Sequence, residues 1–429
     1  MRPDALLDHA AALVQRVLQF RQPSDAEVAA YFREHRLLGP RERQALADTV
    51  YALLRRLPTL RHLAGVDGDA ASAAPGAAVA PRRLAALAWC GDRELLQAAL
   101  DPRERSWLLE ATAVDPAALP EALRHNLPAW LAAALQASLG TAQFWSLIEA
   151  LGQPAPLDLR VNVLKARRDA VRRSLAALGI SAEPTPHSPL GLRVAGKPGL
   201  QKLALFTHGE VEVQDEGSQL IALLVGARRG ELVVDFCAGA GGKTLALGAE
   251  MRDTGRLYAF DVSGHRLAAL KPRLTRSSLS NVHTVQIAHE RDERIERLAG
   301  KIDRVLVDAP CSGLGTLRRS PDLKWRQSPA SIAELQQRQA AILQSAARLV
   351  KPGGRVVYAT CSLLESEGEA IADAFSAAHG RDFAPVAAGP VLARAQVAEA
   401  ESLTQGEHLR LWPHRHGTDG FFAALWTRR

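Results

Sequence analysis

The chain has 429 residues and a formal charge of +7, and 47% of its residues are hydrophobic. This length allows two or three domains with sizeable cores, and the composition excludes wholesale disorder. Most of the basic residues are arginine, whose planar guanidinium suits phosphates and stacked bases. The charge therefore favours a nucleic-acid partner over a membrane, although it could also serve solubility alone.

The four cysteines, Cys90, Cys237, Cys311 and Cys361, lie far apart and form no C-x-x-C pair. This spacing predicts neither structural zinc nor a secreted disulfide framework. No signal peptide is evident, and no stretch reaches the roughly 18 uncharged apolar residues that span a bilayer. We therefore expect a cytoplasmic protein that binds no metal and no membrane. Cys90, beside Trp89 in an apolar helical stretch, is expected in the core.

The range 1–125 is predicted to be an all-α domain. Apolar residues recur at helical spacing to about residue 66, with a break at Gly39-Pro40, where Pro40 suits the first turn of a new helix. The small-residue stretch Asp67–Pro81 is predicted to be a loop or short linker. Further helices are expected over Leu84–Cys90, Arg93–Leu100 and Glu104–Ala111.

The range 126–208 is predicted to hold linker helices and a small α+β module. Leu157–Lys165 alternates like a strand, and a helix over Arg168–Leu178 and short strands near Leu192–Val194 and Val211–Val213 are expected to follow. This region carries five arginines, Arg160, Arg167, Arg168, Arg172 and Arg173. They form either a solvated basic face or a surface that contacts phosphates.

The range 209–429 is predicted to form one α/β domain, because strands and helices alternate as in a parallel sheet. The expected strands are Leu232–Phe236, Arg256–Phe260, His283–Ile287, Arg304–Asp308, Arg355–Ala359 and a final Phe421–Thr427. Ser331-x-x-Glu334 predicts a capping box for the helix before the fifth strand, and Gly353-Gly354 predicts its end.

The stretch Val233–Thr244 (VVDFCAGAGGKT) is typical of a strand, a glycine-rich turn and a helix start, which exposes amides to a ligand. The stretch is not a Walker phosphate-binding loop, which requires glycine where Cys237 stands. It is not the dinucleotide-binding fingerprint either, which requires glycine or alanine where Thr244 stands. An acid at the end of the strand favours a cationic cofactor, and S-adenosylmethionine fits. The amides and Lys243 can serve its carboxylate, and Asp261, after the next strand, can accept two ribose hydroxyls.

Two buried strands, within Ile302–Gly315 and Gly354–Ser362, end in loops that carry Cys311 and Cys361. The ends of such strands are predicted to face one pocket. Two thiols near a methyl donor indicate methylation of a carbon that is not itself nucleophilic, such as C5 of a pyrimidine, after a thiolate adds to C6. Asp308 lies where it could stabilise this adduct at N3. Redox sensing by the two thiols is the alternative.

GAGGKT, DAPCSG and ATCS, in this order, resemble the motifs of the RsmB/NOP family of RNA cytosine-C5 methyltransferases, above all its bacterial 16S rRNA members. The resemblance covers roughly Leu157–Arg429 and includes VQDEGSQL, LRRSPDLKW and PHRHGTDGFFAA. It implies a class I, Rossmann-like methyltransferase sheet preceded by a small α+β module that positions RNA. Arg41–Arg56 is similar to the signature helix of the antitermination factor NusB, which implies a NusB-like N-terminal domain.

The resemblance also implies roles for individual residues. Cys361 would attack C6, Cys311 would assist release of the product, and Asp308 would contact the target base and the cofactor. The implied contacts to S-adenosylmethionine are Cys237, Ala238, Gly239, Ala240, Gly241, Gly242, Lys243, Asp261 and Asp308. The implied substrate is structured RNA, and the expected target is 16S rRNA before or during small-subunit assembly. The protein is expected to be a monomer. A tRNA or 23S rRNA methyltransferase, or a non-catalytic RNA-binding assembly protein, are the alternatives.

Two departures from the family pattern concern the cofactor. Gly239 and Ala240 replace an alanine and a proline of the family loop, which should loosen the turn but keep its amides. After the third strand the family tends to have an acid that holds the adenine amine, and Gln286–Glu293 offers no clean match. Glu290 or Asp292 could substitute, or the contact could be absent.

Overall fold

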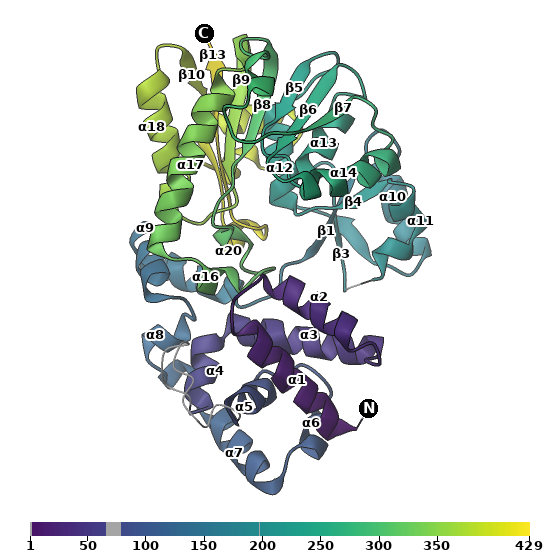
Figure 1. The fold of residues 1–429 in the computed structure, drawn as a ribbon, viewed down its shortest axis with the longest axis vertical. Helices are drawn as coiled ribbons and strands as arrows, with labels where there is room; N and C mark the ends of the chain where they lie inside the picture. Colours follow the sequence, from purple (N-terminus) through teal and green to yellow (C-terminus); the bar gives the residue numbers. More distant parts are fainter. Residues whose placement is uncertain (1, 66–78, 197) are drawn as a thin grey trace. The chain divides into compact units, whose positions relative to one another are not determined.

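The computed structural model describes residues 2–65, 79–196 and 198–429. Their contacts divide the chain into two compact units, which are described separately below. One comprises Met1–Pro154 with Leu317–Ser328, and the other comprises Ala155–Thr316 with Pro329–Arg429. Figure 1 labels the helices and strands of both. In the described ranges, no helix has the length and apolar character needed to cross a membrane.

The first unit is helical, as predicted for the N-terminal part of the chain. Its helices are α1 (Pro3–Val17), α2 (Ser24–Glu34), α3 (Pro40–Arg55), α4 (Leu57–Leu63), α5 (Val79–Leu87), α6 (Arg93–Ala99), α7 (Pro102–Ala113), α8 (Glu121–Arg124), α9 (Ala129–Leu151) and α16 (Leu323–Arg326), with a 3₁₀ turn at Pro116–Ala118. Helix α3 begins at Pro40, as expected. Of the predicted linker, residues 67–78 lie outside the described residues, and the rest belongs to α5.

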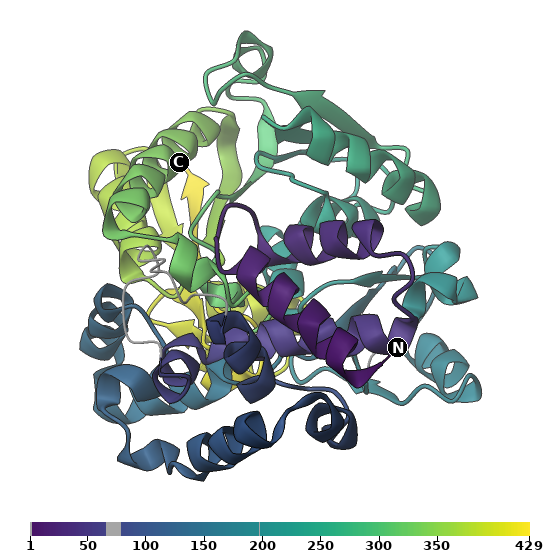
Figure 2. The same cartoon turned by 60° about the horizontal axis from the view of Figure 1, so that its bottom comes forward.

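The core of the helical unit is built on α1, whose buried face packs with α3 and α5, and Figures 1 and 2 both show α1 beside α3. The expectation that Cys90 is a core residue was wrong, because its side chain is exposed. The helix that was expected to carry it ends at Leu87, so Cys90 lies in the segment that follows the helix.

The segment Leu317–Ser328 belongs to the helical unit although it follows most of the chain in sequence. Asp322 caps α2 by accepting hydrogen bonds from the amide and hydroxyl of Ser24, at 3.1 and 2.7 Å. Lys324 Nζ and Trp325 Nε1 donate to two carbonyls at the end of α3, at 3.0 and 3.1 Å. This late segment therefore supplies hydrogen-bond partners to the start of α2 and to the end of α3.

The second unit begins with a four-stranded antiparallel sheet, ordered β2-β3-β1-β4. Its elements are β1 (Leu157–Val161), α10 (Arg168–Ala177), β2 (Ala182–Pro184), β3 (Gly191–Val194), a 3₁₀ turn (Leu200–Lys202), α11 (Ala204–Thr207) and β4 (Val211–Val213). The predicted strands and helix are confirmed. The short strand β2 was not predicted.

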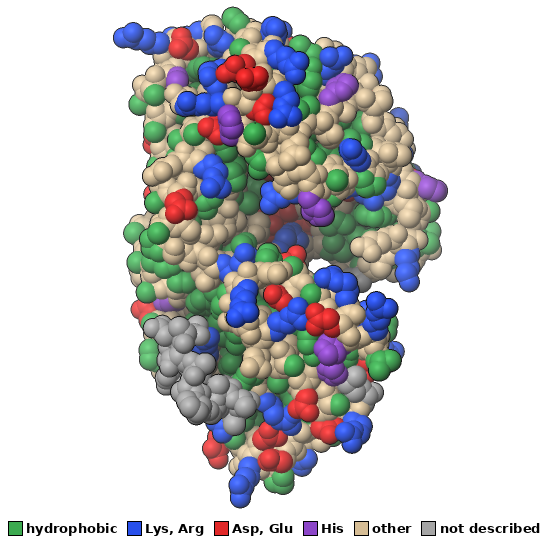
Figure 3. Space-filling model, viewed as in Figure 1, with side chains coloured by type: hydrophobic (Ala, Val, Ile, Leu, Met, Phe, Trp, Pro, Cys, Tyr) green, Lys and Arg blue, Asp and Glu red, His purple; other side chains and the backbone are tan. Residues whose placement is uncertain are grey.

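The arginines of this small module do not form one surface. Arg160 is buried and donates a hydrogen bond from Nε to Gln214 Oε1 at 2.6 Å, and burial lowers the pKa of its guanidinium to about 10. Arg172 pairs with Glu183, while Arg167 and Arg173 are exposed. Both interpretations of the cluster were therefore wrong for Arg160. On the face seen in Figure 3, lysines and arginines lie scattered among acidic and apolar side chains.

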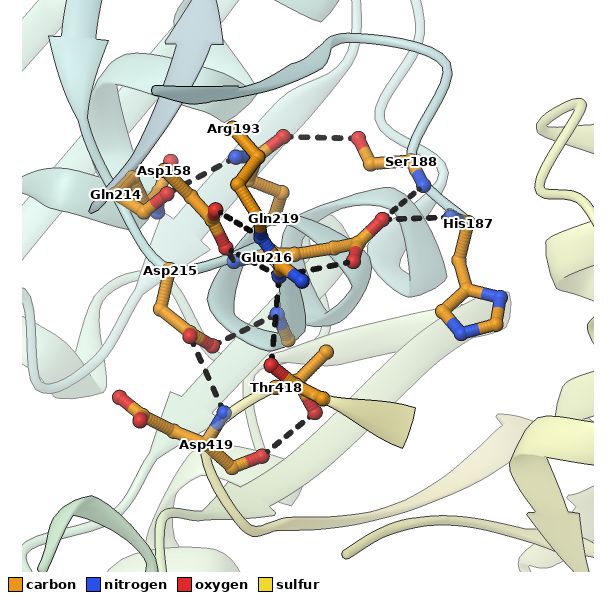
Figure 4. Close-up of polar contacts among 12 residues, drawn as sticks. Asp158, His187, Ser188, Arg193, Gln214, Asp215, Glu216, Gln219, Thr418 and Asp419 are labelled. Carbon is orange, nitrogen blue, oxygen red and sulfur yellow. Dashed lines mark hydrogen bonds and ion pairs between the residues drawn. The ribbon is translucent and has the colours of Figure 1, made fainter. Parts of the chain in front are cut away.

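A buried polar cluster joins the small sheet to α12 (Glu216–Val225), as Figure 4 shows. Arg193 of β3 donates two hydrogen bonds to Asp158 of β1, at 2.8 and 3.0 Å, and lies 3.9 Å from Glu216. Glu216 also accepts the amides of His187 and Ser188, at 2.6 and 2.7 Å. The side chains of Asp158 and Glu216 are completely buried, so Arg193 is the cation that compensates both.

Arg193→Met is expected to lower the free energy of unfolding by about 3 kcal/mol, because it leaves two buried carboxylates without their cation. The measurement is urea unfolding of the full chain. Arg172→Met is the matched control, since Arg172 and Glu183 form an exposed pair with side chains 45% and 72% accessible, and its unfolding midpoint should not change. Equal effects of the two variants would contradict the importance of burial.

The second unit also contains a nine-stranded sheet, ordered β11-β12-β13-β9-β8-β5-β6-β7, with β10 paired to β13. Strands β5 to β9 run parallel, and β13 is antiparallel to β9 (Figure 1). The strands are β5 (Leu232–Asp235), β6 (Arg256–Asp261), β7 (Val282–Gln286), β8 (Ile302–Asp308), β9 (Val350–Thr360), β10 (Phe383–Val386), β11 (Thr404–Gln405), β12 (His408–Leu411) and β13 (Phe421–Arg428). The predicted α/β sheet and its six strands are confirmed.

Helices cover both faces of this sheet. Besides α12 they are α13 (Gly242–Glu250), α14 (Gly264–Ser277), α15 (Glu293–Glu296), α17 (Pro329–Ala347), α18 (Glu369–His379), α19 (Ala388–Arg394) and α20 (Pro413–His416), with 3₁₀ turns at Leu314–Thr316 (η3), Glu365–Glu367 (η4) and Ala400–Leu403 (η5). Leu306 and Val357 pack with α12 and α19, whereas Val307 and Tyr358 pack with α17 and α18. Because both faces are buried, polar residues concentrate at the strand ends.

Two local predictions in this sheet were wrong. Helix α17 begins at Pro329, so Ser331 and Glu334 lie inside the helix and form no capping box at its start. The helix ends at Ala347, and Gly353-Gly354 lies within β9 instead of stopping the helix. A side chain on Gly354 would come within 2.9 Å of the carbonyl oxygen of Asp303 on β8, so glycine here permits close strand contact.

Candidate active site

The candidate site lies at the carboxyl ends of β5, β6, β8 and β9, the edge where parallel α/β sheets bind ligands. Strands β8 and β9 are neighbours and run parallel, with Asp308 paired to Ala359. Cys361 follows the last residue of β9 directly, and Cys311 lies three residues beyond the end of β8. The sheet order therefore brings two loops together that are fifty residues apart in sequence.

The two sulfur atoms of these loops are 3.4 Å apart, in contact but not bonded. The hydrogen bond with Cys361 and burial raise the pKa of the Cys311 thiol well above its usual value. Cys311 therefore keeps its proton near neutral pH and can donate it in a hydrogen bond to the Cys361 sulfur. The predicted convergence of the two strand ends is confirmed at the level of individual atoms.

Backbone contacts hold the two cysteine loops against each other. The amide of Gly315 donates to the carbonyl of Cys361, and the amide of Gly420 donates to the carbonyl of Gly315, both at 2.9 Å. A Cβ at Gly315 would stand 2.0 Å from the carbonyl oxygen of Gly420, so only glycine allows this approach. The final GTDGFF stretch of the chain therefore supports the loop that carries Cys311.

Lys243 and Asp308 form an ion pair beside the thiols. Lys243 Nζ donates to Asp308 Oδ2 at 2.7 Å and lies 5.4 Å from the centre of the Phe421 ring. Burial opposes the charged ammonium, but attraction to Asp308 outweighs it and raises the pKa of Lys243. In this structure the Lys243 ammonium orients Asp308, and its contact with a cofactor carboxylate stays a prediction. The Asp308 side chain is 29% accessible, so it can still contact a ligand.

The glycine-rich loop Cys237–Gly242 connects β5 to α13 as predicted. Gly241 has φ = +85° and caps α13, and a Cβ there would stand 2.1 Å from Leu270. The amide of Gly239 donates to Asp261 Oδ2 at 2.8 Å, so this amide is already engaged by the protein. Burial raises the pKa of Cys237 well above its usual value, which identifies it as a neutral thiol that packs beneath the loop.

Asp261 ends β6 next to this loop. It accepts the amides of Gly239 and Ser263, at 2.8 and 2.7 Å, which fixes the direction of the carboxylate. Each oxygen keeps a further lone pair for a hydroxyl group. Val262, the next residue, is 60% exposed although it is apolar. Val262 could not be predicted as a site residue from the sequence, since a single valine after an acid gives no signal until its exposure is known.

Asp235, the last residue of β5, is the acid from which the sequence predicted a cationic cofactor, although it was not among the predicted cofactor contacts. Its side chain is buried, and Thr244 Oγ1 donates to its Oδ2 at 2.6 Å. No described residue bonds to Oδ1. Burial raises the pKa of this carboxyl group to about 7. An acceptor that is buried and unpartnered beside a ligand-binding loop fits a cationic group of a bound molecule.

The end of the third strand, β7, distinguishes the two candidate acids. Asp292 accepts the amide of Ala288 at 2.8 Å and caps α15. Hydrogen bonds from Arg294 hold the pKa of its carboxyl group well below the usual range. Asp292 is thus committed to local structure. The side chain of Glu290, 28% accessible and 4.0 Å from Arg291, is the one that could turn toward a ligand.

The described residues contain no group of three or more histidine, cysteine or acidic side chains that could hold a metal ion. Among the predicted site residues, the structure gathers two sets. One consists of Cys311, Cys361, Asp308 and Lys243, and the other of the Cys237–Gly242 loop with Asp261. Lys243 connects the two sets, because it directly follows the Cys237–Gly242 loop in sequence and pairs with Asp308.

Several curated proteins with similar sequences are named ribosomal RNA small subunit methyltransferase B. The chain is 37% identical over 302 residues to a probable ribosomal RNA small subunit methyltransferase B of Synechocystis, covering 70% of this chain and 66% of that protein. It is 33% identical over 306 residues to ribosomal RNA small subunit methyltransferase B of Photorhabdus laumondii, covering 71% of this chain and 67% of that protein. The chain belongs to the RsmB/F family.

Two family models match this RsmB/F chain. The model of 16S rRNA methyltransferase RsmB/F matches residues 222–427, which contain both thiols and the glycine-rich loop. The ferredoxin-like domain model of RsmF/B-like methyltransferases matches residues 127–200. The alignment with the Synechocystis relative spans slightly less than two thirds of that relative's length.

Solved structures share the fold of this RsmB/F chain. A methyltransferase homologue from Pyrococcus horikoshii is 28% identical, with a TM-score of 0.60, and the match covers 74% of this chain and all of that one. NSun6 from Pyrococcus horikoshii, solved with SFG, is 19% identical with a TM-score of 0.60, covering 70% of this chain and 98% of that one. The nine-stranded sheet is therefore the Rossmann-like methyltransferase sheet expected from the sequence.

Proposed function

We propose that this chain methylates carbon 5 of cytosine in structured RNA, with S-adenosylmethionine as methyl donor. The contact of two thiols at the ends of neighbouring strands carries this proposal. The proposed target is 16S rRNA before or during small-subunit assembly, in line with the names of the curated relatives, and the proposed active form is a monomer. The target cytosine must leave its stack to reach the thiols.

In the proposed reaction the two thiols have different roles. The Cys361 sulfur forms a bond to C6 of cytosine, and the electron pair of the C5–C6 double bond becomes available at C5 for the methyl group. A base such as water then takes the C5 proton, which restores the double bond and expels the Cys361 sulfur from C6 as a thiolate, to which a neighbouring protonated thiol can donate a hydrogen bond. Cys311, which keeps its proton and touches Cys361, is placed to assist this release.

Asp308 is proposed to hold the base. Its partly accessible carboxylate, oriented by Lys243, can accept hydrogen bonds from the exocyclic amine of cytosine and from N3 when N3 is protonated. The carboxylate stabilises a proton on N3, and this proton neutralises the negative charge that the ring gains as Cys361 adds to C6. The ion pair thus connects base binding to the loop at the start of α13.

The residues around the glycine-rich loop fit S-adenosylmethionine. The methyl group of its sulfonium supplies the one-carbon unit. Asp235 Oδ1 is a buried acceptor for a cationic group, Asp261 has lone pairs for ribose hydroxyls, and exposed Val262 offers an apolar surface for adenine. The relative solved with SFG, an S-adenosylmethionine analogue, supports this cofactor. Cys237–Gly242 is proposed to line the methionine end.

Asp235→Asn is expected to weaken S-adenosylmethionine binding about tenfold, or about 1.4 kcal/mol, by removing the charge while keeping the side-chain size. Calorimetric titration measures this. Since burial raises the pKa of Asp235 to about 7, wild-type affinity should rise from pH 6 to pH 8 as the carboxyl ionises, and the variant should lose this rise. Glu293→Gln, on exposed α15, is the control. Wild-type affinity that is independent of pH would contradict this role.

The proposed function is tested by incubating the full chain with labelled S-adenosylmethionine and undermodified total RNA, followed by bisulfite sequencing to map 5-methylcytosine. Label at one cytosine of 16S rRNA is the expected result. Label only in tRNA or 23S rRNA would keep the chemistry and change the target. Absence of label from every RNA, together with RNA binding, would favour a non-catalytic assembly protein.

A further inference from the structure

A buried carboxylate lies beneath both cysteine loops. Glu367, the last residue of η4, is completely buried. Its carboxylate accepts two hydrogen bonds from Ser312, through the amide and the hydroxyl, one from the Ser362 hydroxyl at 2.6 Å and one from Gln339 of α17 at 2.9 Å. The two serines directly follow the two cysteines in sequence, so a single side chain connects both loops.

The two loops are built in the same way. The hydroxyl of Ser312 accepts the amide of Leu314 at 3.4 Å, and the hydroxyl of Ser362 accepts the amide of Leu364 at 3.1 Å. Each hydroxyl thus closes a local turn and uses its own proton to bind Glu367. The 3.3 Å distance between the two hydroxyl oxygens shows how closely this carboxylate draws the turns together.

The loops differ in how much they depend on Glu367. The Cys361 loop has further supports, since Arg410 donates to the carbonyls of Ser362 and Leu363, at 3.1 and 2.8 Å. The Cys311 loop is also held by Gly315 beyond the cysteine and by Gln339, which donates to the carbonyl of Pro310 at 3.0 Å. However, Gln339 is itself a partner of Glu367, and Ser312 takes two of the four bonds to the carboxylate. Loss of Glu367 should therefore displace Cys311 more than Cys361.

We propose that Glu367 is a positioning residue that keeps the Cys311 sulfur next to Cys361, so that the product can be released in the proposed reaction. The inference rests on the proposed function for its link to release, and on the hydrogen bonds alone for the position of the thiols. The negative charge of Glu367 also contributes to the raised pKa of Cys311, after the hydrogen bond with Cys361 and burial, and so favours the protonated thiol.

The first test measures the distance between the thiols without RNA. Phenylarsine oxide bonds to two thiols at once, releasing water, and binds tightly only where both sulfurs are close. Glu367→Ala should weaken its binding about 100-fold, because the second thiol loses effective concentration. Glu367→Gln, which keeps the size and one acceptor oxygen, should weaken it less. Glu365→Ala, in the same turn but exposed, should leave it unchanged.

Two serine variants form a matched pair in the same assay. Ser312→Ala removes the hydroxyl partner of Glu367 from the loop that makes two bonds to this carboxylate, and it should weaken arsenical binding more than Ser362→Ala. Cys311→Ala gives the binding of a single thiol and sets the lower limit. Unchanged arsenical affinity in both Glu367 variants would overturn the inference, whatever the effect on thermal stability.

The second test uses the proposed reaction. Glu367→Ala should lower kcat about 100-fold, because a misplaced Cys311 thiol assists release poorly. KM for RNA should not change, and the covalent RNA adduct should accumulate. A variant that forms no adduct would overturn the proposal, because Cys361 would then depend on Glu367 as much as Cys311 does. If wild-type protein methylates no RNA, the proposed function fails while the arsenical assay still tests the position of the thiols.

Discussion

Cys361→Ala is expected to abolish both methylation and the covalent RNA adduct. The proposed first step is formation of a bond between this sulfur and C6, and in the described site only Cys311 offers another sulfur within 3.4 Å. Cys311 keeps its proton, so it is a poor replacement nucleophile. Turnover should fall at least about 1,000-fold, as for other enzymes that lose their nucleophile.

The measurement combines methyl transfer from labelled S-adenosylmethionine with a denaturing gel that detects RNA bound covalently to the protein. Cys90→Ala is the matched control, because Cys90 is exposed in the helical unit and should not affect either result. S-adenosylmethionine affinity should be the same in both variants. Residual methylation above one tenth of the wild-type rate in Cys361→Ala would assign the attack to another group.

Cys311→Ala is expected to give the opposite pattern, in which the covalent RNA adduct accumulates. Cys361 keeps its position at the end of β9, so the bond to C6 still forms. Release is slowed because the neighbouring thiol is missing, and turnover should fall about 100-fold, a typical contribution of acid–base assistance. A time course on denaturing gels should show the adduct persisting after a single turnover.

The comparison of the two cysteine variants shows which thiol attacks C6 and which thiol assists release. If Cys311→Ala forms no adduct while Cys361→Ala does, the roles are reversed and the thiol at the end of the β8 loop attacks. If both variants behave alike, the two thiols do not have separate roles. Cys311→Ser adds a variant of nearly unchanged size, which separates loss of the thiol from loss of packing.

The main sheet and its thiols could be predicted because they depend on strong local patterns. Strands buried on both faces, such as β8 and β9, are continuous apolar runs, and the first polar residues after them mark the edge of the sheet. Asp308, Cys311 and Cys361 all occupy such positions. Parallel pairing of neighbouring strands then suffices to bring them together.

Predictions that depend on contacts distant in sequence were less successful. Arg160 was predicted to lie on a surface because its hydrogen-bond partner in the buried environment, Gln214, is distant in sequence. The ion pair of Lys243 could not be predicted either, because its partner Asp308 is sixty-five residues away. Glu367 carried no local signal, since its four hydrogen bonds come from three separate parts of the chain.

Local signals also failed where two structures could use the same residues. Ser331 and Glu334 have the spacing of a capping box, but Pro329 already begins the helix two residues earlier. Gly353-Gly354 is a common helix stop, yet here it allows β9 to approach β8. In both cases the residue types were informative and the choice between their uses depended on the tertiary structure.

The position of Leu317–Ser328 in the helical unit affects how the protein is made. Helix α2 receives its cap from Asp322, and the end of α3 receives donors from Lys324 and Trp325. During synthesis the N-terminal helices leave the ribosome long before this segment is translated. Until about three quarters of the chain has been synthesised, α2 and α3 lack the hydrogen bonds from this segment. They can form these contacts only after the loop that carries Cys311 has been translated.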